Sequence, residues 1–209
     1  MEMRYDLDNH RHSIRLAGYD YSQTGAYFVT ICVNSRECLF GEIISGQMRM
    51  NEFGETVQTI WNRLEERFTN ITTDQFIIMP NHVHGIIVIN QSVVGAIHEL
   101  PLPDKNQRRC MLLPKIVGYF KMNTAKRIND FQKTPGVSVW QRNYYEHIIR
   151  NERELNKIRE YIMYNPLKWE LDFENPSSKK EYKNFTEYLE ENITQGLLAP
   201  NRPDSRGNS

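Results

Sequence analysis

Two histidines separated by one residue, His82 and His84, are the residues of this chain best suited to binding a metal ion. They lie within residues 79–89, where an apolar run that begins at Ile86 predicts a buried β-strand. A strand sends residues i and i+2 to the same face, so we expect both imidazoles to point into one site. Neutral imidazoles bind several transition metals. The alternative is that both histidines lie on a solvated strand face.

A tyrosine and an asparagine, Tyr161 and Asn165, are the next candidates for chemistry. The spacing of apolar residues predicts a helix over residues 152–165, with acidic residues in its first turn and Pro166 just past its end. Helical periodicity places Tyr161 at the edge of the apolar stripe and Asn165 one turn further on the same side. The tyrosine hydroxyl and the amide oxygen can therefore face one cleft. Alternatively, Tyr161 is an amphipathic residue at the helix edge and Asn165 merely ends the helix.

Composition excludes several classes of protein. The 209 residues are 39% hydrophobic and 25% charged, as in an ordinary globular protein, and the net charge is zero. The apolar runs are too short to cross a bilayer and the N-terminus lacks an export pattern, so we expect a cytoplasmic protein with no membrane partner. Three cysteines without CxxC spacing predict neither a disulfide framework nor a cysteine zinc site.

The charge is unevenly distributed along the chain. Residues 101–170 contain 14 basic and 7 acidic residues, whereas residues 41–100 contain 3 basic and 7 acidic residues. A segregated positive half is what binding to a phosphate backbone requires, although lysine-rich helices also serve solubility. The candidate DNA-binding residues are four basic side chains and one aromatic that can stack on a base, namely Lys121, Lys126, Arg127, Arg142 and Tyr144.

The order of the predicted elements indicates an α+β fold with a mainly antiparallel sheet. Strands are predicted at 25–33, 76–89 and 137–141, with another short element at 144–149 and a hairpin at 38–50. Helices are predicted after Asn51, at 115–130, at 152–165 and at 184–191. Proline at position 80 is expected to mark a bend or a new start in the second strand. We expect one domain over residues 1–170, with an N-terminal arm at 1–20 and a long loop at 90–113, followed by a polar tail at 171–209.

Four segments together resemble a known family. Residues 79–87 (MPNHVHGII) resemble the His–hydrophobic–His motif of HUH single-strand nucleases, and residues 161–166 (YIMYNP) resemble the tyrosine motif of REP-associated tyrosine transposases. Two further matches are residues 18–30, which begin with GYDY and end with GAYFVT, and residues 139–150 (VWQRNYYEHIIR). The resemblance covers about residues 10–170. These proteins are relatives of the small single-tyrosine transposases of the IS200-like type.

The resemblance implies a fold, a mechanism and a set of roles. The fold is a central antiparallel sheet covered by helices, as in HUH endonucleases, with the histidines on a central strand. His82, His84 and Asn165 would bind Mg²⁺ or Mn²⁺, and Tyr161 would be the nucleophile. The expected activity is metal-dependent cleavage and rejoining of single-stranded DNA through a 5′-phosphotyrosine, at hairpins of the REP type.

Two related functions stay open at the level of the sequence. One is a domesticated protein that binds folded single strands without cutting them, and the other is a nickase of the replication-initiator type. A cupin-like metal site is excluded because the glutamate expected a few residues after the histidines is absent. The expected partner is single-stranded or hairpin DNA, which would bring the protein to the nucleoid, and the chain would act as a monomer or a homodimer.

Overall fold

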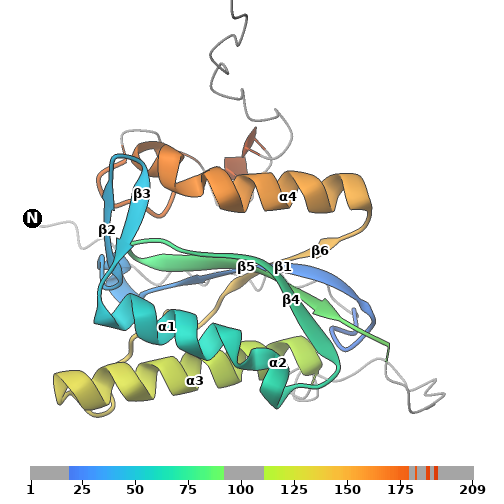
Figure 1. Cartoon of the computed structure of the whole chain (residues 1–209), viewed down its shortest axis with the longest axis horizontal. Helices are drawn as coiled ribbons and strands as arrows, with labels where there is room; N and C mark the ends of the chain where they lie inside the picture. The colour runs from blue at the N-terminus through green and yellow to red at the C-terminus, as the bar shows by residue number, and fades with distance from the viewer. Residues whose placement is uncertain (1–18, 92–110, 179–181, 183–186, 189–190, 193–209) are drawn as a thin grey trace, which may run out of the picture.

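The computed structural model describes residues 19–91, 111–178, 182, 187–188 and 191–192. Its centre is a four-stranded antiparallel sheet in the order β4-β5-β1-β6 (Figure 1). The strands are β1 (Gly25–Cys32), β4 (Ile71–Ile78), β5 (His82–Ile89) and β6 (Tyr145–Ile149). The predicted α+β fold with a mainly antiparallel sheet is therefore confirmed.

The two central strands, β1 and β5, form the most deeply buried part of the sheet. Their β-branched and aromatic residues suit a strand that is covered on both faces. Antiparallel pairing sets Thr30 opposite His84 and Cys32 opposite His82. Since side chains alternate across a strand, Phe28, Thr30 and both histidines share one face of the sheet.

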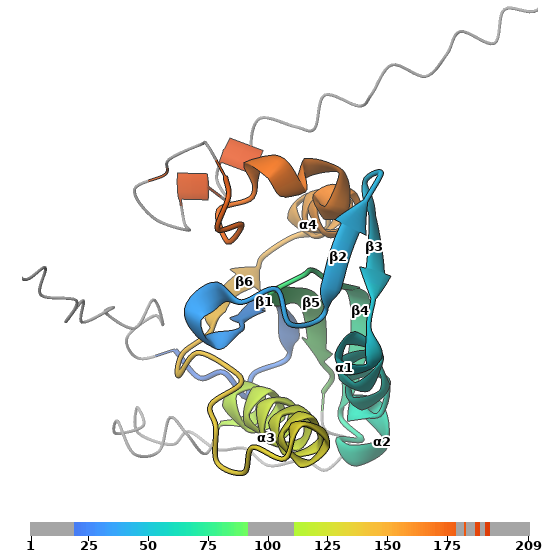
Figure 2. The same cartoon turned by 90° about the vertical axis from the view of Figure 1, so that its left-hand side faces the viewer.

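Helices cover both faces of this sheet (Figures 1 and 2). On one face lie α1 (Glu52–Asn62), α2 (Leu64–Arg67) and α3 (Leu112–Gln132). Their core contains Trp61 and Phe120, whose rings meet edge to face, and Trp61 also stacks on Phe76. Asn51 caps α1 by accepting hydrogen bonds from the amides of residues 53 and 54, as its sequence position suggested.

The opposite face is covered by α4 (Glu152–Tyr164) and the 3₁₀ helix η3 (Asn165–Leu171). Asn151 caps α4 by accepting a hydrogen bond from the amide of Glu154. A second, smaller core forms beneath α4 from Phe28, Ile86, Ile158 and Ile162, with Tyr161 among them. The tyrosine helix therefore packs on the face of the sheet that bears the histidines.

A separate hairpin, β2 (Gly41–Ile44) and β3 (Gln47–Met50), stands beside η3. The turn residues Ser45 and Gly46 both have positive φ, and this confirms the predicted small-residue turn. The positive φ of Gly46 favours glycine at this position, and a Cβ there would meet the end of the exposed Leu167 side chain of η3. A short 3₁₀ turn, η1 (Asn34–Arg36), links β1 to this hairpin.

Several sequence predictions were wrong in detail. The segment predicted as a strand over 76–89 is two strands joined by a turn at residues 79–81, so the new start expected at Pro80 is confirmed. The error lies in the beginning of the first strand, because β4 already starts at Ile71. The predicted strand over 137–141 is a single bridge between Val33 and Trp140. Helix α3 begins at Leu112, inside the predicted loop.

Parts of other predictions lie outside the described residues. These are the N-terminal arm up to residue 18, the loop over 92–110, and much of the tail and of the helix predicted at 184–191. The division of the chain at residue 170 stays a prediction. Among the described helices, none is long and apolar enough to cross a membrane.

Candidate active site

The two histidines lie at the start of β5 and face each other. Their Nε2 atoms are 3.0 Å apart, and both side chains are fully buried. The Nδ1 atom of His82 lies 2.8 Å from Oδ1 of Asn81, and Nδ1 of His84 lies 2.8 Å from Oγ1 of Thr30. Each ring is thus held through Nδ1, which directs both Nε2 atoms to one point.

The hydrogen-bond network assigns the proton positions. The Asn81 amide nitrogen donates to the carbonyls of Arg36 and Glu174, so its oxygen must accept, and His82 carries its proton on Nδ1. The Nε2 atom of His82 is therefore a bare acceptor, and His84 donates to it from Nε2. His84 then accepts the Thr30 hydroxyl proton at Nδ1. A hydroxyl can also accept a hydrogen bond, so Thr30 is equally a partner for the other tautomer of His84, in which Nδ1 carries the proton and donates to Oγ1. In that tautomer Nε2 of His84 has a lone pair available to bind a metal.

Burial keeps both imidazoles neutral. It lowers the pKa of His82 to about 4, with nearby Glu174 opposing the shift and Arg36 adding to it. The pKa of His84 is lowered well below its usual value by the same burial and by its neighbour His82. Neutral imidazole is the form that binds metal ions.

Tyr161 and Asn165 enter the same site from the end of α4. The Tyr161 hydroxyl lies 3.2 Å from Nε2 of His84, and its ring meets Phe28 edge to face. Tyr161 and Asn165 are each 2% exposed. Burial raises the Tyr161 pKa well above 10, so the hydroxyl is protonated here; the adjacent Asn165 amide opposes this shift. Neither polar atom of the Asn165 side chain makes a hydrogen bond of good geometry with a described residue, although this amide adjoins both Tyr161 and Asp172.

A carboxylate that the sequence analysis missed completes the site. Asp172 follows η3, is 1% exposed, and lies with His82 and His84 so that their ligand atoms are all within 4.8 Å of one another. Burial raises its pKa to about 6, although it accepts hydrogen bonds from the Glu174 amide and from Tyr188. Two imidazole nitrogens and a carboxylate oxygen form a donor set that can bind a divalent cation.

The segment after η3 is hydrogen-bonded to Asn81, the residue just before the histidine-bearing strand β5. The Asn81 amide nitrogen donates to the Glu174 carbonyl at 2.7 Å, and the Glu174 carboxylate pairs with Arg36 at 3.1 Å. Tyr188 lies against Tyr161, with ring centroids 6.2 Å apart, and donates to Asp172. Residues beyond 170 therefore cover the candidate active site.

Two charged contacts fix α4 along its length. Near its middle, the guanidinium of Arg159 forms a bidentate pair with Asp74 of β4, at 2.9 and 2.6 Å. Near its start, Glu154 contacts Nε2 of His147 at 2.7 Å and accepts the backbone amide of Arg150. The helix that carries Tyr161 is thereby attached to both edge strands of the sheet.

The candidate DNA-binding residues fall into two groups. Lys121, Arg142 and Tyr144 lie around one pocket between α3 and the segment that leads into β6. Lys126 and Arg127 are exposed further along α3 and do not line that pocket. Tyr144 packs with the core beneath α3, so this pocket lies on the opposite side of the sheet from Tyr161.

The chain has relatives among known bacterial proteins. An uncharacterized protein of Haemophilus influenzae is 43% identical over 173 residues, which cover 78% of this chain and 92% of that protein. A second protein of the same organism, described as a "Putative REP-associated tyrosine transposase", is 22% identical over 153 residues, or 71% of this chain and 74% of the relative. No protein-family model matches the chain.

Two solved structures are similar to the chain. A REP-associated tyrosine transposase bound to a REP hairpin aligns with a TM-score of 0.48 and 18% identity, over 75% of this chain and 73% of the other. A protein of Deinococcus radiodurans described as a "putative transposase" aligns with a TM-score of 0.40 and 16% identity, over 71% of this chain and 95% of the other.

Proposed function

Because the chain belongs to one family with the uncharacterized Haemophilus influenzae protein and is a sequence relative of REP-associated tyrosine transposases, we propose that it cuts and rejoins single-stranded DNA. Tyr161 is the nucleophile, and the reaction depends on a divalent cation. The observation that carries this proposal is the position of the Tyr161 hydroxyl, 3.2 Å from His84 in the cluster of metal-binding groups. In this proposal the nucleophile and the cation site belong to the same chain.

The residues present suit a divalent cation. His82 and His84 are neutral with their Nε2 atoms directed to one point, and Asp172 supplies an oxygen. Asn165 lies beside Asp172 and is proposed as a further oxygen ligand. Mg²⁺ or Mn²⁺ is the proposed ion, since oxygen ligands suit both. When bound, such an ion stabilises the charge that develops on the phosphoryl oxygens.

The protein's own residues perform the transfer. The Tyr161 oxygen attacks the phosphorus, the bond between phosphorus and the 3′-oxygen breaks, and the 3′-oxygen leaves as a hydroxyl after gaining a proton. The Tyr161 hydroxyl loses its proton in the same exchange. The downstream strand is left on Tyr161 through its 5′-phosphate, and attack by a 3′-hydroxyl reverses the reaction without ATP.

Substrate entry requires movement around Tyr161. With an exposed fraction of 2%, its hydroxyl cannot reach a DNA phosphate unless part of its cover is displaced. Beyond η3, Asp172 and Tyr188 both interact with Tyr161 and are hydrogen-bonded to each other. We place the displacement there because α4 itself is attached to the sheet at Asp74 and His147.

A labelling experiment tests the function. A pool of single-stranded DNA hairpins, labelled at either the 5′ or the 3′ end, is incubated with Mn²⁺ and the wild-type protein, Tyr161→Phe or Tyr164→Phe. We expect the wild type and Tyr164→Phe to release a shortened 5′-labelled strand and to retain the 3′-labelled strand on the protein. Tyr161→Phe should do neither. Metal-dependent cutting that persists in Tyr161→Phe would assign the nucleophile elsewhere, and hairpin binding without cutting would indicate a binding protein.

A further inference from the structure

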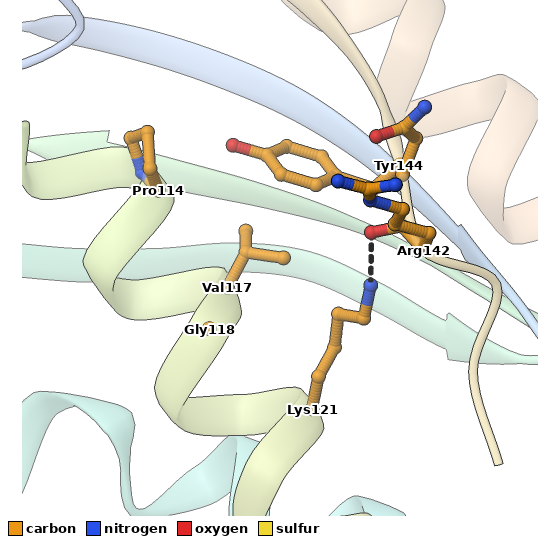
Figure 3. A pocket seen from close by; sticks show the side chains of 7 residues that line it. Pro114, Val117, Gly118, Lys121, Arg142 and Tyr144 are labelled. Carbon is orange, nitrogen blue, oxygen red and sulfur yellow. Dashed lines mark hydrogen bonds between the residues drawn. The ribbon is translucent and has the colours of Figure 1, made fainter. Parts of the chain in front are cut away.

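A pocket of about 450 Å³ opens between α3 and the segment that enters β6, away from the candidate active site (Figure 3). Four of its lining residues come from α3: Pro114, Val117, Gly118 and Lys121. Arg142 and Tyr144 line the facing wall. Ligand pockets in proteins commonly have volumes of roughly 300 to 1,000 Å³, so this one is large enough for a nucleotide.

Lysine 121 holds one wall of the pocket in place. Its ammonium group donates to the backbone carbonyls of Gln141 and Arg142, at 2.6 and 3.0 Å. Figure 3 shows the hydrogen bond to Arg142. This attachment fixes the segment that carries Arg142 and Tyr144, and it also brings a positive charge to the pocket. Arg142 is exposed and forms no ion pair with any carboxylate in the described part of the chain.

Glycine 118 makes room in the pocket at a cost to the helix. It lies in the interior of α3, where glycine is less favourable than alanine by about 1 kcal/mol. Its φ is not in the left-handed region, and a Cβ built on it meets no atom within 4 Å. Neither backbone conformation nor packing therefore calls for glycine at this position, whereas an open pocket does.

We propose that this pocket binds one unpaired nucleotide of a single-stranded DNA substrate. The base would stack against the Tyr144 ring beside Pro114, and its phosphate would contact Lys121 and Arg142. An aromatic ring flanked by two cations is the arrangement by which proteins bind unpaired bases with their backbone. The identity of the ligand rests on the proposed function, but the pocket is separate from Tyr161 and would set the affinity and position of the strand.

Filling the pocket tests the proposal without disturbing the fold. A Gly118→Leu side chain would enter open space, and leucine is a good helix former, so the melting temperature should not fall. The probe is a fluorescein-labelled DNA hairpin with randomised unpaired flanks, and its binding is measured by fluorescence anisotropy in EDTA. We expect Gly118→Leu to weaken binding about tenfold, which corresponds to the stacking of one base. Arg142→Gln should weaken binding by a similar factor because it removes a phosphate contact.

Two matched variants separate the pocket from general charge and helix effects. Gly118→Ala changes the helix propensity but leaves most of the pocket open, and Lys126→Gln removes a cation of α3 that lies outside it. Both should bind within about twofold of the wild type. Three results would each overturn the proposal that this pocket binds a nucleotide. They are unchanged binding by Gly118→Leu, an equal loss of binding in Lys126→Gln and Arg142→Gln, and a wild type that does not bind the probe.

The pocket and the proposed reaction can fail separately. A wild type that forms the covalent adduct while Gly118→Leu binds DNA normally would refute the pocket alone. A wild type whose binding depends on Gly118 and Arg142 but which never forms the adduct would support the pocket and refute the proposed cleavage.

Discussion

Replacing Thr30 by valine should weaken metal binding although Thr30 itself contacts no metal. The substitution keeps the shape of the side chain and removes the hydroxyl that lies 2.8 Å from Nδ1 of His84. Thr30 is 1% exposed and His84 is fully buried, so no bulk water can replace the lost partner. The ring of His84 then loses this hydrogen bond to β1 at Nδ1.

The size of the effect follows from the tautomers. Without metal, His84 accepts at Nδ1, and an unsatisfied buried acceptor costs about 1–3 kcal/mol. With metal at Nε2, the proton must move to Nδ1 and needs an acceptor, which valine cannot provide. Loss of a partner that orients a histidine ligand typically weakens metal binding by about 10- to 100-fold. We expect a loss in this range for Mn²⁺.

Isothermal titration calorimetry with Mn²⁺, alongside urea unfolding of the metal-free protein, measures both quantities. Thr30→Ser is the matched control: it keeps the hydroxyl and removes one methyl group, so its Mn²⁺ affinity should stay within about threefold of the wild type, and its stability should fall by about 1 kcal/mol. If Thr30→Val bound Mn²⁺ as tightly as Thr30→Ser, the orienting role of Thr30 would be refuted. The assignment of His84 as a ligand would then lose its support from this hydrogen bond.

Three further predictions concern stability. Gly85→Ala should lower the free energy of unfolding in urea by about 1–3 kcal/mol, because its Cβ would overlap the buried ring of the tryptophan in α1; an unchanged value would contradict this packing. Arg159→Gln should lower the free energy of unfolding by about 0.5–1 kcal/mol, since the ion pair with Asp74 that it breaks is partly exposed; a decrease above about 3 kcal/mol would contradict that reasoning. The metal-free protein should lose stability as the pH falls from about 6.5 to about 4, because unfolding lets His82 and His84 take up protons that their lowered pKa values exclude in the fold. The pKa of Asp172 is raised to about 6, so the folded protein protonates this group at a higher pH than the unfolded chain does, which opposes the loss of stability. Asp172→Asn should therefore make stability fall more steeply with decreasing pH. Greater stability of the wild type at pH 4.5 than at pH 7 would contradict the burial of two neutral histidines.

Local sequence patterns predicted the positions of many of the strands and helices. The β-branched run predicted a strand at 25–33, close to the observed Gly25–Cys32, and Asn51 marked the start of α1. The start of β4 was missed because residues 71–75 are mostly polar and partly exposed, and because a register shift between Thr73 and Phe76 interrupts the regular alternation. A strand of this kind is fixed by its pairing with β5 rather than by its own pattern.

The candidate site was only partly predictable. The spacing of His82 and His84 on a strand, and of Tyr161 and Asn165 on a helix, determined which side chains share a face. Asp172 belongs to no helix or strand, and it reaches the histidines only because the chain folds back after η3. The sequence gives no periodic signal for such a contact. The role of Asn81 was hidden for the same reason, since it depends on the carbonyl of Glu174, 93 residues away.

The central claim is that Tyr161 carries the DNA, and peptide mapping of the protein–DNA adduct tests it most directly. After reaction with a single-stranded hairpin and Mn²⁺, the protein is digested with trypsin and a nuclease, and the modified peptide is identified by mass spectrometry. We predict a 5′-linked nucleotide on Tyr161, absent from Tyr161→Phe and present in Tyr164→Phe. A nucleotide on another tyrosine, or cleavage that leaves none on the protein, would contradict the account.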